Sequence, residues 1–151
     1  MNEQVYSIAS LSQKGKCNMN IATYIVPITM KPKQYLVAVY RDTETHQNIF
    51  IEKQSFLLQA LSLQNISTVK VLGKKSGKVF DKVSYILKQK PLYYENIPYL
   101  QRTSFVLACV GKQYIEVGDH DIIVAEVIKI ISHSDEPLLG TVTLQAKNII
   151  G

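Results

Sequence analysis

The chain has 151 residues, of which 46% are hydrophobic and 19% are charged, and its net charge is +5 at pH 7. These values exclude a disordered chain and are typical of a single domain over residues 1–151, which can bury a core without disulfides or a metal. The longest apolar run, residues 122–131, contains Glu126 and Lys129 and is too short to cross a bilayer, so we expect no membrane segment.

The first residues and the cysteines indicate a compartment. The chain opens MNEQVYSIAS, which lacks the basic segment and apolar stretch of a secretory signal. Cys17 and Cys109 belong to no CxxC pair and to no Cys/His cluster. We therefore expect a cytoplasmic protein with two free thiols.

Two apolar runs in the first half of the chain have the composition of strands. Residues 35–40 (YLVAVY) follow a turn at Lys31-Pro32-Lys33 and are rich in aromatic and β-branched side chains, which predicts a buried strand. Residues 55–61 (SFLLQAL) are a second candidate strand, although their Leu and Gln side chains also suit a helix.

Two short helices are expected between the strands. The first is capped by Asp42 or Thr43 and runs to about Lys53. The second has Asn65 as its N-cap and ends at Gly73. The apolar side chains that share one face of this second helix are Ile66, Val69 and Leu72.

Residues 105–117 and 122–132 are the two longest strand candidates, and Gly118-Asp119-His120-Asp121 separates them. A glycine in so short a connection predicts a β-hairpin with a loop longer than two residues. A β-rich chain with two short helices between its strands favours a closed Greek-key barrel.

No residue pattern indicates a metal site or a nucleophilic catalyst. The three histidines, His46, His120 and His133, are far apart in the sequence, and none lies in an HExxH motif. We therefore expect no metal site. A loop histidine such as His120 is more often a solvated turn residue than a catalytic one.

The turn between the first predicted strand and the first predicted helix is a candidate binding segment. It places Arg41, Thr43 and Thr45 at a helix N-terminus, whose free N–H groups and positive dipole end suit a phosphate. Asp42 and Glu44 carry the wrong charge for an anion site. On these residues alone, the simpler interpretation is that Asp42 and Thr43 only cap the helix.

Two further segments are candidates for ligand binding. Residues 18–24 (NMNIATY) are polar and then small, and such a stretch can lay backbone amides and an Asn side chain along a planar heterocycle. Residues 73–78 (GKKSGK) lack the residue order of a P-loop. A nucleic-acid-binding surface is an alternative use of the basic residues nearby, although no aromatic side chains interleave with them. These residues are Lys70, Lys74, Lys75, Lys78 and Lys82.

Taken in order, several stretches resemble the flavin reductase-like family with its FMN-binding split barrel, and in particular its flavoredoxin-like members. Residues 20–24 (NIATY) and 35–45 (YLVAVYRDTET) are similar to the family's polar loop, buried strand and Ser/Thr-bearing turn. Residues 73–82 (GKKSGKVFDK) are similar to its G-x-x-S-G-[RK]-x-x-D-K stretch. Residues 117–127 (VGDHDIIVAEV) are similar to its closing hairpin, with the signature G-D-H-x-I-x-x-x-E-V. The resemblance extends over residues 6–132.

The resemblance implies a mainly β fold with short helices, a six-stranded Greek-key split β-barrel, and FMN bound at the interface of a homodimer. His120 matches the family histidine that points toward the flavin or the nicotinamide, which makes it the candidate catalytic residue. The positions implied for the flavin ring are Asn20, Ile21, Ala22 and Thr23, those for the ribityl and phosphate groups are Tyr40, Arg41, Thr43 and Thr45, and those on the basic loop are Ser76, Lys78 and Lys82.

The implied function is an NAD(P)H-dependent flavin reductase, in which hydride passes from C4 of the nicotinamide of NADH or NADPH to N5 of FMN. Hydride transfer needs no side-chain acid or base, which agrees with the lack of a catalytic motif. The tail after Pro137 lacks the aromatic residues common in reductases that serve flavin monooxygenases. Two alternatives stay open, namely a non-catalytic FMN-binding electron-transfer protein and a nucleic-acid-binding small barrel.

Overall fold

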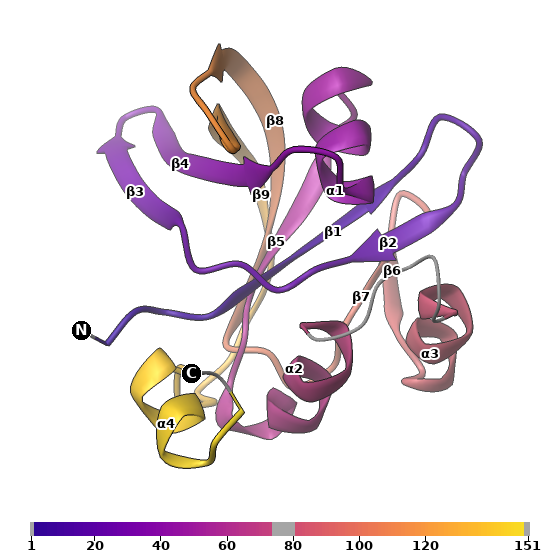
Figure 1. The fold of residues 1–151 in the computed structure, drawn as a ribbon, viewed down its shortest axis with the longest axis vertical. Helices are drawn as coiled ribbons and strands as arrows, with labels where there is room; N and C mark the ends of the chain where they lie inside the picture. The colour runs from indigo at the N-terminus through magenta and orange to yellow at the C-terminus, as the bar shows by residue number, and fades with distance from the viewer. Residues whose placement is uncertain (1, 74–80, 150–151) are drawn as a thin grey trace.

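The computed structural model describes residues 2–73 and 81–149. One antiparallel sheet dominates the fold, with α1 at one end of the molecule and α2, α3 and α4 at the other (Figure 1). The strands of this sheet are β1 (Tyr6–Leu11), β2 (Cys17–Met19), β3 (Ile25–Met30), β4 (Lys33–Tyr40), β5 (Phe56–Ala60), β8 (Phe105–Glu116) and β9 (His120–His133). The remaining elements are the strand pair β6 (Leu92–Tyr94) and β7 (Ile97–Tyr99), and the helical segments α1 (Glu44–His46), η1 (Gln47–Ile51), η2 (Leu63–Asn65), α2 (Ile66–Leu72), α3 (Lys82–Lys88) and α4 (Thr141–Ala146).

The segment between β2 and β3 closes the sheet on itself. The strand order is β2-β1-β5-β8-β9-β4-β3, so β1 and β4 lie near opposite edges. Tyr6 of β1 exchanges two backbone hydrogen bonds with Ala22, of 2.8 and 2.9 Å. The backbone N–H of Ala38 in β4 donates to Tyr24 O at 3.0 Å. Residues 20–24 therefore bridge the two edges and complete a barrel, as the sequence predicts.

The two strand predictions in the first half of the chain are confirmed. Residues 35–40 lie in β4, and residues 56–60 form β5 rather than a helix. Every residue of β5 is buried, with Phe56 and Leu58 in one core cluster and Leu57 in the other. A strand between two cores needs apolar side chains on both faces, which explains why its sequence does not alternate.

The described sheet has seven strands, one more than the six that the family resemblance implies. The physical reason is the bridging segment, residues 20–24, which turns away from the edge of the sheet and separates β2 from β3. β3 was not predicted from the sequence. It contains Pro27, and it is exposed along nearly its whole length, so it lacks the pattern of a buried strand. The mainly β class with short helices is as expected.

The predicted hairpin is formed by β8 and β9, and it is the longest ladder in the molecule. Its loop has three residues, 117–119, and the N–H of Gly118 donates to His120 O at 3.1 Å. β9 begins at His120, two residues earlier than the sequence predicts, because His120 and Asp121 pair with Tyr40 and Val39 of β4. This early start places both side chains beside the end of β4.

The first predicted helix is present, and Thr43 is its cap. The Thr43 hydroxyl accepts from the backbone N–H of His46 at 3.1 Å, and α1 continues directly into the π-helical turn η1. Asp42 is excluded from the cap position because its φ of 63° lies in the left-handed region. Glu52 ends the segment, one residue before Lys53.

The second predicted helix begins earlier than expected. Asn65 does precede α2, but its carboxamide oxygen accepts from the N–H of Ser62 at 3.0 Å and so belongs to a capping box around η2. Gly73 closes α2 as predicted. The first cap is therefore Ser62, a residue that propensity alone did not separate from its polar neighbours.

Several short elements were not predicted, namely β1, β2, β6, β7, α3 and α4. They span three to seven residues each, too few to give a clear periodic pattern. No helix in residues 2–73 and 81–149 has both the length and the apolar character needed to cross a membrane. Cys17 and Cys109 are free thiols, as expected, and both are buried.

Candidate functional site

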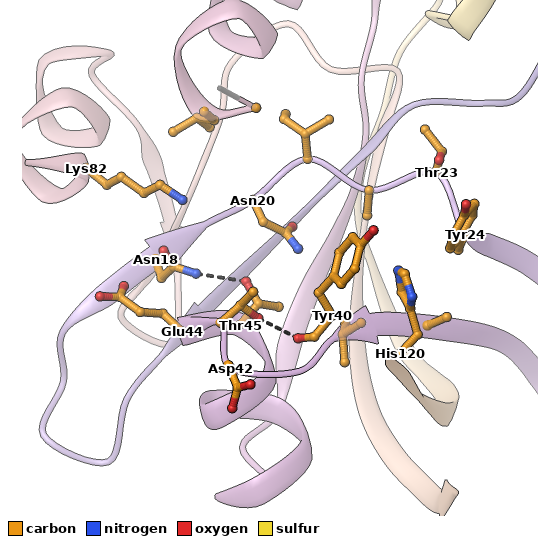
Figure 2. A pocket seen from close by; sticks show the side chains of 17 residues that line it. Asn18, Asn20, Thr23, Tyr24, Tyr40, Asp42, Glu44, Thr45, Lys82 and His120 are labelled. Carbon is orange, nitrogen blue, oxygen red and sulfur yellow. Dashed lines mark hydrogen bonds between the residues drawn. The ribbon is translucent and has the colours of Figure 1, made fainter. Parts of the chain in front are cut away.

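A cavity of about 540 Å³ opens where the bridging segment, the end of β4, and the N-terminal end of α1 meet (Figure 2). Its volume lies within the range of pockets that hold small organic ligands and cofactors. The described residues that line it are Asn18, Asn20, Ile21, Ala22, Thr23, Tyr24, Ala38, Val39, Tyr40, Asp42, Thr43, Glu44, Thr45, Leu72, Gly73, Lys82 and His120.

The bridging segment forms one wall of the cavity and is fixed by hydrogen bonds to β1. Asn20 accepts from the N–H of Ile8 through its Oδ1 at 2.8 Å, and its own N–H donates to Ile8 O at 3.2 Å. Ala22 forms hydrogen bonds with the backbone of Tyr6 through both its N–H and its C=O. Because backbone groups of an extended segment alternate in direction, the N–H groups of Ile21 and Thr23 face away from β1.

Aromatic rings form the opposite side of the cavity. The His120 imidazole lies 3.9 Å from the Tyr40 ring and 5.0 Å from the Tyr24 ring, measured between centroids (Figure 2). Its Nδ1 is 2.9 Å from Asp119 Oδ1, and this hydrogen bond lowers the pKa of the Asp119 carboxyl. Tyr24 and Tyr40 are more than half exposed, at 57% and 59%, so flat apolar surface is available at this side.

The other end of the cavity is polar. Asn18 Nδ2 donates to Thr45 Oγ1 at 2.9 Å, and both side chains are buried. Lys82 extends from α3 toward Asn18, and its Nζ contacts Met19 O at 3.5 Å (Figure 2). Burial lowers the pKa of Lys82, and the charge of Glu44 opposes that shift. Glu44 also pairs with Lys16 at 3.3 Å.

Arg41 does not line the cavity, because its guanidinium binds Asp121. The two side chains form a bidentate pair, with Nε to Oδ2 at 2.9 Å and one terminal nitrogen to Oδ1 at 2.8 Å. His46 Nε2 lies 2.8 Å from the same Asp121 carboxylate, and Val117 donates its N–H to it at 3.1 Å. We call Arg41, His46 and Asp121 the Asp121 brace.

The Asp121 brace stands directly behind the cavity. Each of its members follows a residue that lines the cavity, since Arg41 follows Tyr40, His46 follows Thr45, and Asp121 follows His120. The hydrogen bonds from Arg41 and His46 strongly lower the pKa of Asp121. The brace therefore ties together the end of β4, α1 and the start of β9, the three segments that carry Tyr40, Thr45 and His120.

The comparisons with known proteins identify the family. The family model described as "Flavin reductase like domain" matches residues 1–142 of the chain. The chain belongs to the flavin reductase-like family. No curated protein sequence matches it closely.

Solved structures of low sequence identity share the fold of this flavin reductase-like chain. An NADH:FAD oxidoreductase from Streptomyces globisporus, solved with NAD and FAD fragments, is 18% identical, with 93% of this chain and 81% of that chain covered and a TM-score of 0.77. Flavoredoxin from Methanosarcina acetivorans is 19% identical, with coverages of 89% and 70% and a TM-score of 0.76. An FMN-binding protein from Thermus thermophilus is 17% identical, with coverages of 86% and 70% and a TM-score of 0.74.

The structure brings most of the predicted site residues together. Arg41 has a different partner from the predicted phosphate, and Ser76 and Lys78 lie outside the described residues. Asp42 and Glu44, whose charge is wrong for an anion site, both line the cavity. The predicted residues that line it are Asn20, Ile21, Ala22, Thr23, Tyr40, Thr43, Thr45, Lys82 and His120.

The sequence reasoning missed Asp121, and it included Asn18 and Tyr24 only as the ends of the candidate segment 18–24, without selecting them as site residues. Asn18 and Tyr24 flank the predicted segment 20–23, and the alternation of an extended chain offered no reason to select them. Asp121 follows the G-D-H motif at a position that the family signature leaves open, so only its buried contacts reveal its importance.

Proposed function

We propose that the chain is an FMN-binding, NAD(P)H-dependent flavin reductase that acts as a single-domain protein. The observation that carries this proposal is a single cavity with three different walls in a member of the flavin reductase-like family. One wall offers backbone amides, one offers aromatic rings and one is polar. A planar heterocycle fits between the amide and aromatic walls, and its hydroxylated and phosphorylated chain fits the polar wall.

The bridging segment would hold the flavin ring. The N–H groups of Ile21 and Thr23 face away from β1 and are in position to donate to the ring's heteroatoms, while Ala22 presents only a methyl group. Asn20 serves chiefly to fix the segment through Ile8. When bound, the flavin supplies the acceptor for a hydride from a reduced nicotinamide.

The ribityl and phosphate groups would lie toward Tyr40, Thr43, Thr45 and Lys82. Lys82 is the basic side chain among the described lining residues, and half-burial strengthens its attraction for an anion. Ser76 and Lys78, which precede it in the sequence, remain predicted contributors. Arg41 would act indirectly, by holding the end of β4 through Asp121.

His120 is the proposed catalytic residue. It packs against Tyr40 and Tyr24 on the exposed side of the cavity, where a nicotinamide can approach a bound flavin. Asp119 holds its Nδ1, so the ring keeps one orientation. Its role would be to orient the nicotinamide or to shield the flavin face, since the hydride itself needs no proton donor.

A homodimer forms part of the proposal. Val26, Leu36 and Val124 stand side by side across β3, β4 and β9, and the inward-facing row next to them is Ile25, Val37 and Ile123. Val26 is 48% exposed, and Met30 on the same strand is 88% exposed. Val124 is only 9% exposed, so the exposed apolar surface of this face comes mainly from β3. Exposed apolar patches are typical of protein interfaces. A molar mass in solution of twice the chain mass is expected.

A non-catalytic FMN-binding electron-transfer protein is the second candidate. It is favoured by the shared fold with flavoredoxin and the FMN-binding protein, although fold alone does not transfer function. The sequence-based alternative of a nucleic-acid-binding barrel has less support, because Lys82 of the basic group lines the cavity instead of an open surface.

The test has two stages. The purified protein is mixed with FMN, desalted, and examined for the visible absorbance of bound flavin, and the loaded protein is then mixed anaerobically with NADH or NADPH. Retained flavin that is bleached by either nucleotide supports the reductase. Retained flavin that neither nucleotide bleaches indicates the electron-transfer protein. Protein that neither retains FMN nor oxidises NAD(P)H with added FMN contradicts both.

A further inference from the structure

The side chain of Asn18 has a buried oxygen atom that accepts no hydrogen bond from the described residues. Asn18 is 3% exposed. Among residues 2–73 and 81–149, its Oδ1 is the one buried side-chain nitrogen or oxygen atom that lacks a hydrogen-bond partner. Buried polar groups in native proteins are almost always paired, and an unpaired one costs free energy. Asn18 also lines the cavity, so a ligand is the natural source of the missing partner.

Thr45 holds the Asn18 carboxamide in place. The 2.9 Å hydrogen bond between Asn18 Nδ2 and Thr45 Oγ1 joins β2 to α1 across the polar end of the cavity (Figure 2). Asn18 and Thr45 are both buried, so this hydrogen bond holds the Asn18 carboxamide at the cavity wall. One end of the carboxamide is therefore committed, and the other end is available.

The free carboxamide oxygen of Asn18 determines which chemical group of a ligand can bind there. A carboxamide oxygen accepts hydrogen bonds, so its partner must donate. A hydroxyl group donates, and it also accepts, so it would satisfy either end of the carboxamide. An ionised phosphate oxygen only accepts, and the nearby carboxylate of Glu44, although paired with Lys16, disfavours a second anion.

We propose that Asn18, positioned by Thr45, binds a hydroxyl group of the ligand's polyol chain and so makes the pocket selective for flavins that carry a ribityl chain. This inference rests on the proposed flavin-binding function. It assigns the phosphate to the Lys82 side of the same polar end, close to Thr45 but not hydrogen-bonded to the Asn18–Thr45 pair.

Three ligands separate the parts of the flavin, and the dissociation constant of each is measured by flavin fluorescence. Lumiflavin has the ring with a methyl group in place of the ribityl chain, riboflavin adds the chain, and FMN adds the phosphate. The wild-type chain is expected to bind riboflavin about tenfold more tightly than lumiflavin. In Asn18→Leu, riboflavin and FMN should both weaken by about tenfold, whereas lumiflavin should change by less than about twofold.

Asn48→Leu is the matched control. Asn48 is equally buried, at 4% exposed, and its Nδ2 likewise donates to a hydroxyl, Ser10 Oγ, at 3.0 Å, but it does not line the cavity. It should leave the ratio of riboflavin to lumiflavin affinity unchanged. Thr45→Val, which releases the Asn18 carboxamide without removing it, should reduce that ratio and provides a second variant if Asn18→Leu does not fold.

Each other outcome overturns the inference. Weakening of FMN alone in Asn18→Leu makes Asn18 a phosphate contact, and equal weakening of all three ligands makes it structural. Unchanged riboflavin affinity in a folded Asn18→Leu also contradicts it. If the wild-type chain binds lumiflavin and riboflavin equally, this inference fails while flavin binding stands. If it binds none of the three, the proposed function fails as well.

Discussion

Two polar clusters adjoin the cavity, and they differ in whether the protein satisfies them. The Asp121 brace is complete, because the Asp121 carboxylate accepts hydrogen bonds from Arg41, His46 and Val117. The Asn18–Thr45 pair is incomplete, because Asn18 Oδ1 has no partner among the described residues. A satisfied buried cluster stabilises the fold, whereas an unsatisfied one beside a cavity is a candidate for ligand binding.

The largest expected effect comes from breaking the complete cluster. Asp121→Asn removes the negative charge between Arg41 and His46, and we expect Tm to fall by on the order of 10 °C, as measured by thermal unfolding. Asp119→Asn is the control, because Asp119 is exposed and two residues away, and it should change Tm by only about 1 °C. Equal Tm values for the two variants would contradict a stabilising role for the brace.

The stabilisation that Asp121 contributes should also depend on pH. The pKa of Asp121 is lower in the folded chain than the value of about 3.9 usual in an unfolded one. The stabilisation from this carboxylate is therefore complete above pH 4 or so and is lost as pH falls toward its folded pKa. The difference in stability between the wild type and Asp121→Asn should shrink on acidification through this range, and a difference that grew would disprove the assignment.

A charge at the incomplete cluster tests its proposed role in binding. Thr45→Asp places a carboxylate at the polar end of the cavity, and we expect FMN affinity to fall by about tenfold or more through repulsion of the phosphate. Thr45→Val is the uncharged control and should retain part of the affinity. An unchanged FMN affinity of Thr45→Asp in a fluorescence titration would remove Thr45 from the neighbourhood of the phosphate.

Substitutions on the aromatic side of the cavity should change the rate of flavin reduction more than the affinity for FMN. His120→Ala is expected to slow flavin reduction by NADH or NADPH about tenfold while FMN affinity changes much less, because orientation of the nicotinamide is lost. Stopped-flow absorbance measures the rate. His133→Ala, at the exposed far end of β9, is the control and should leave the rate unchanged. A normal rate in His120→Ala would remove it from the catalytic role.

The smallest effect is expected at Thr43, whose hydroxyl is already used within the protein. It donates to Tyr40 O at 2.8 Å and accepts from the N–H of His46 at 3.1 Å. Thr43→Ala should lower the free energy of unfolding by about 1 kcal/mol, as measured by denaturant titration, and change FMN affinity by less than about threefold. A tenfold loss of affinity would make Thr43 a direct contact of the ligand.

The sequence by itself determined the long elements and the family. β4 and the β8–β9 hairpin are predictable because apolar and β-branched runs bounded by turns specify strands locally. The cap at Thr43 is likewise local. The ordered motifs at residues 20–24, 35–45 and 117–127 led to the flavin reductase-like family, whose match spans residues 1–142.

Only the tertiary structure decided which polar side chains are available to a ligand. Arg41 and Asn18 are both polar residues in predicted binding segments. Nothing in their local sequence indicates that Asp121 binds Arg41 while Asn18 Oδ1 lacks a partner among the described residues. Asp121 lies 80 residues beyond Arg41, and Thr45 lies 27 residues beyond Asn18. Hydrogen-bond satisfaction is a property of groups brought together by the closed barrel, so local pattern does not encode it.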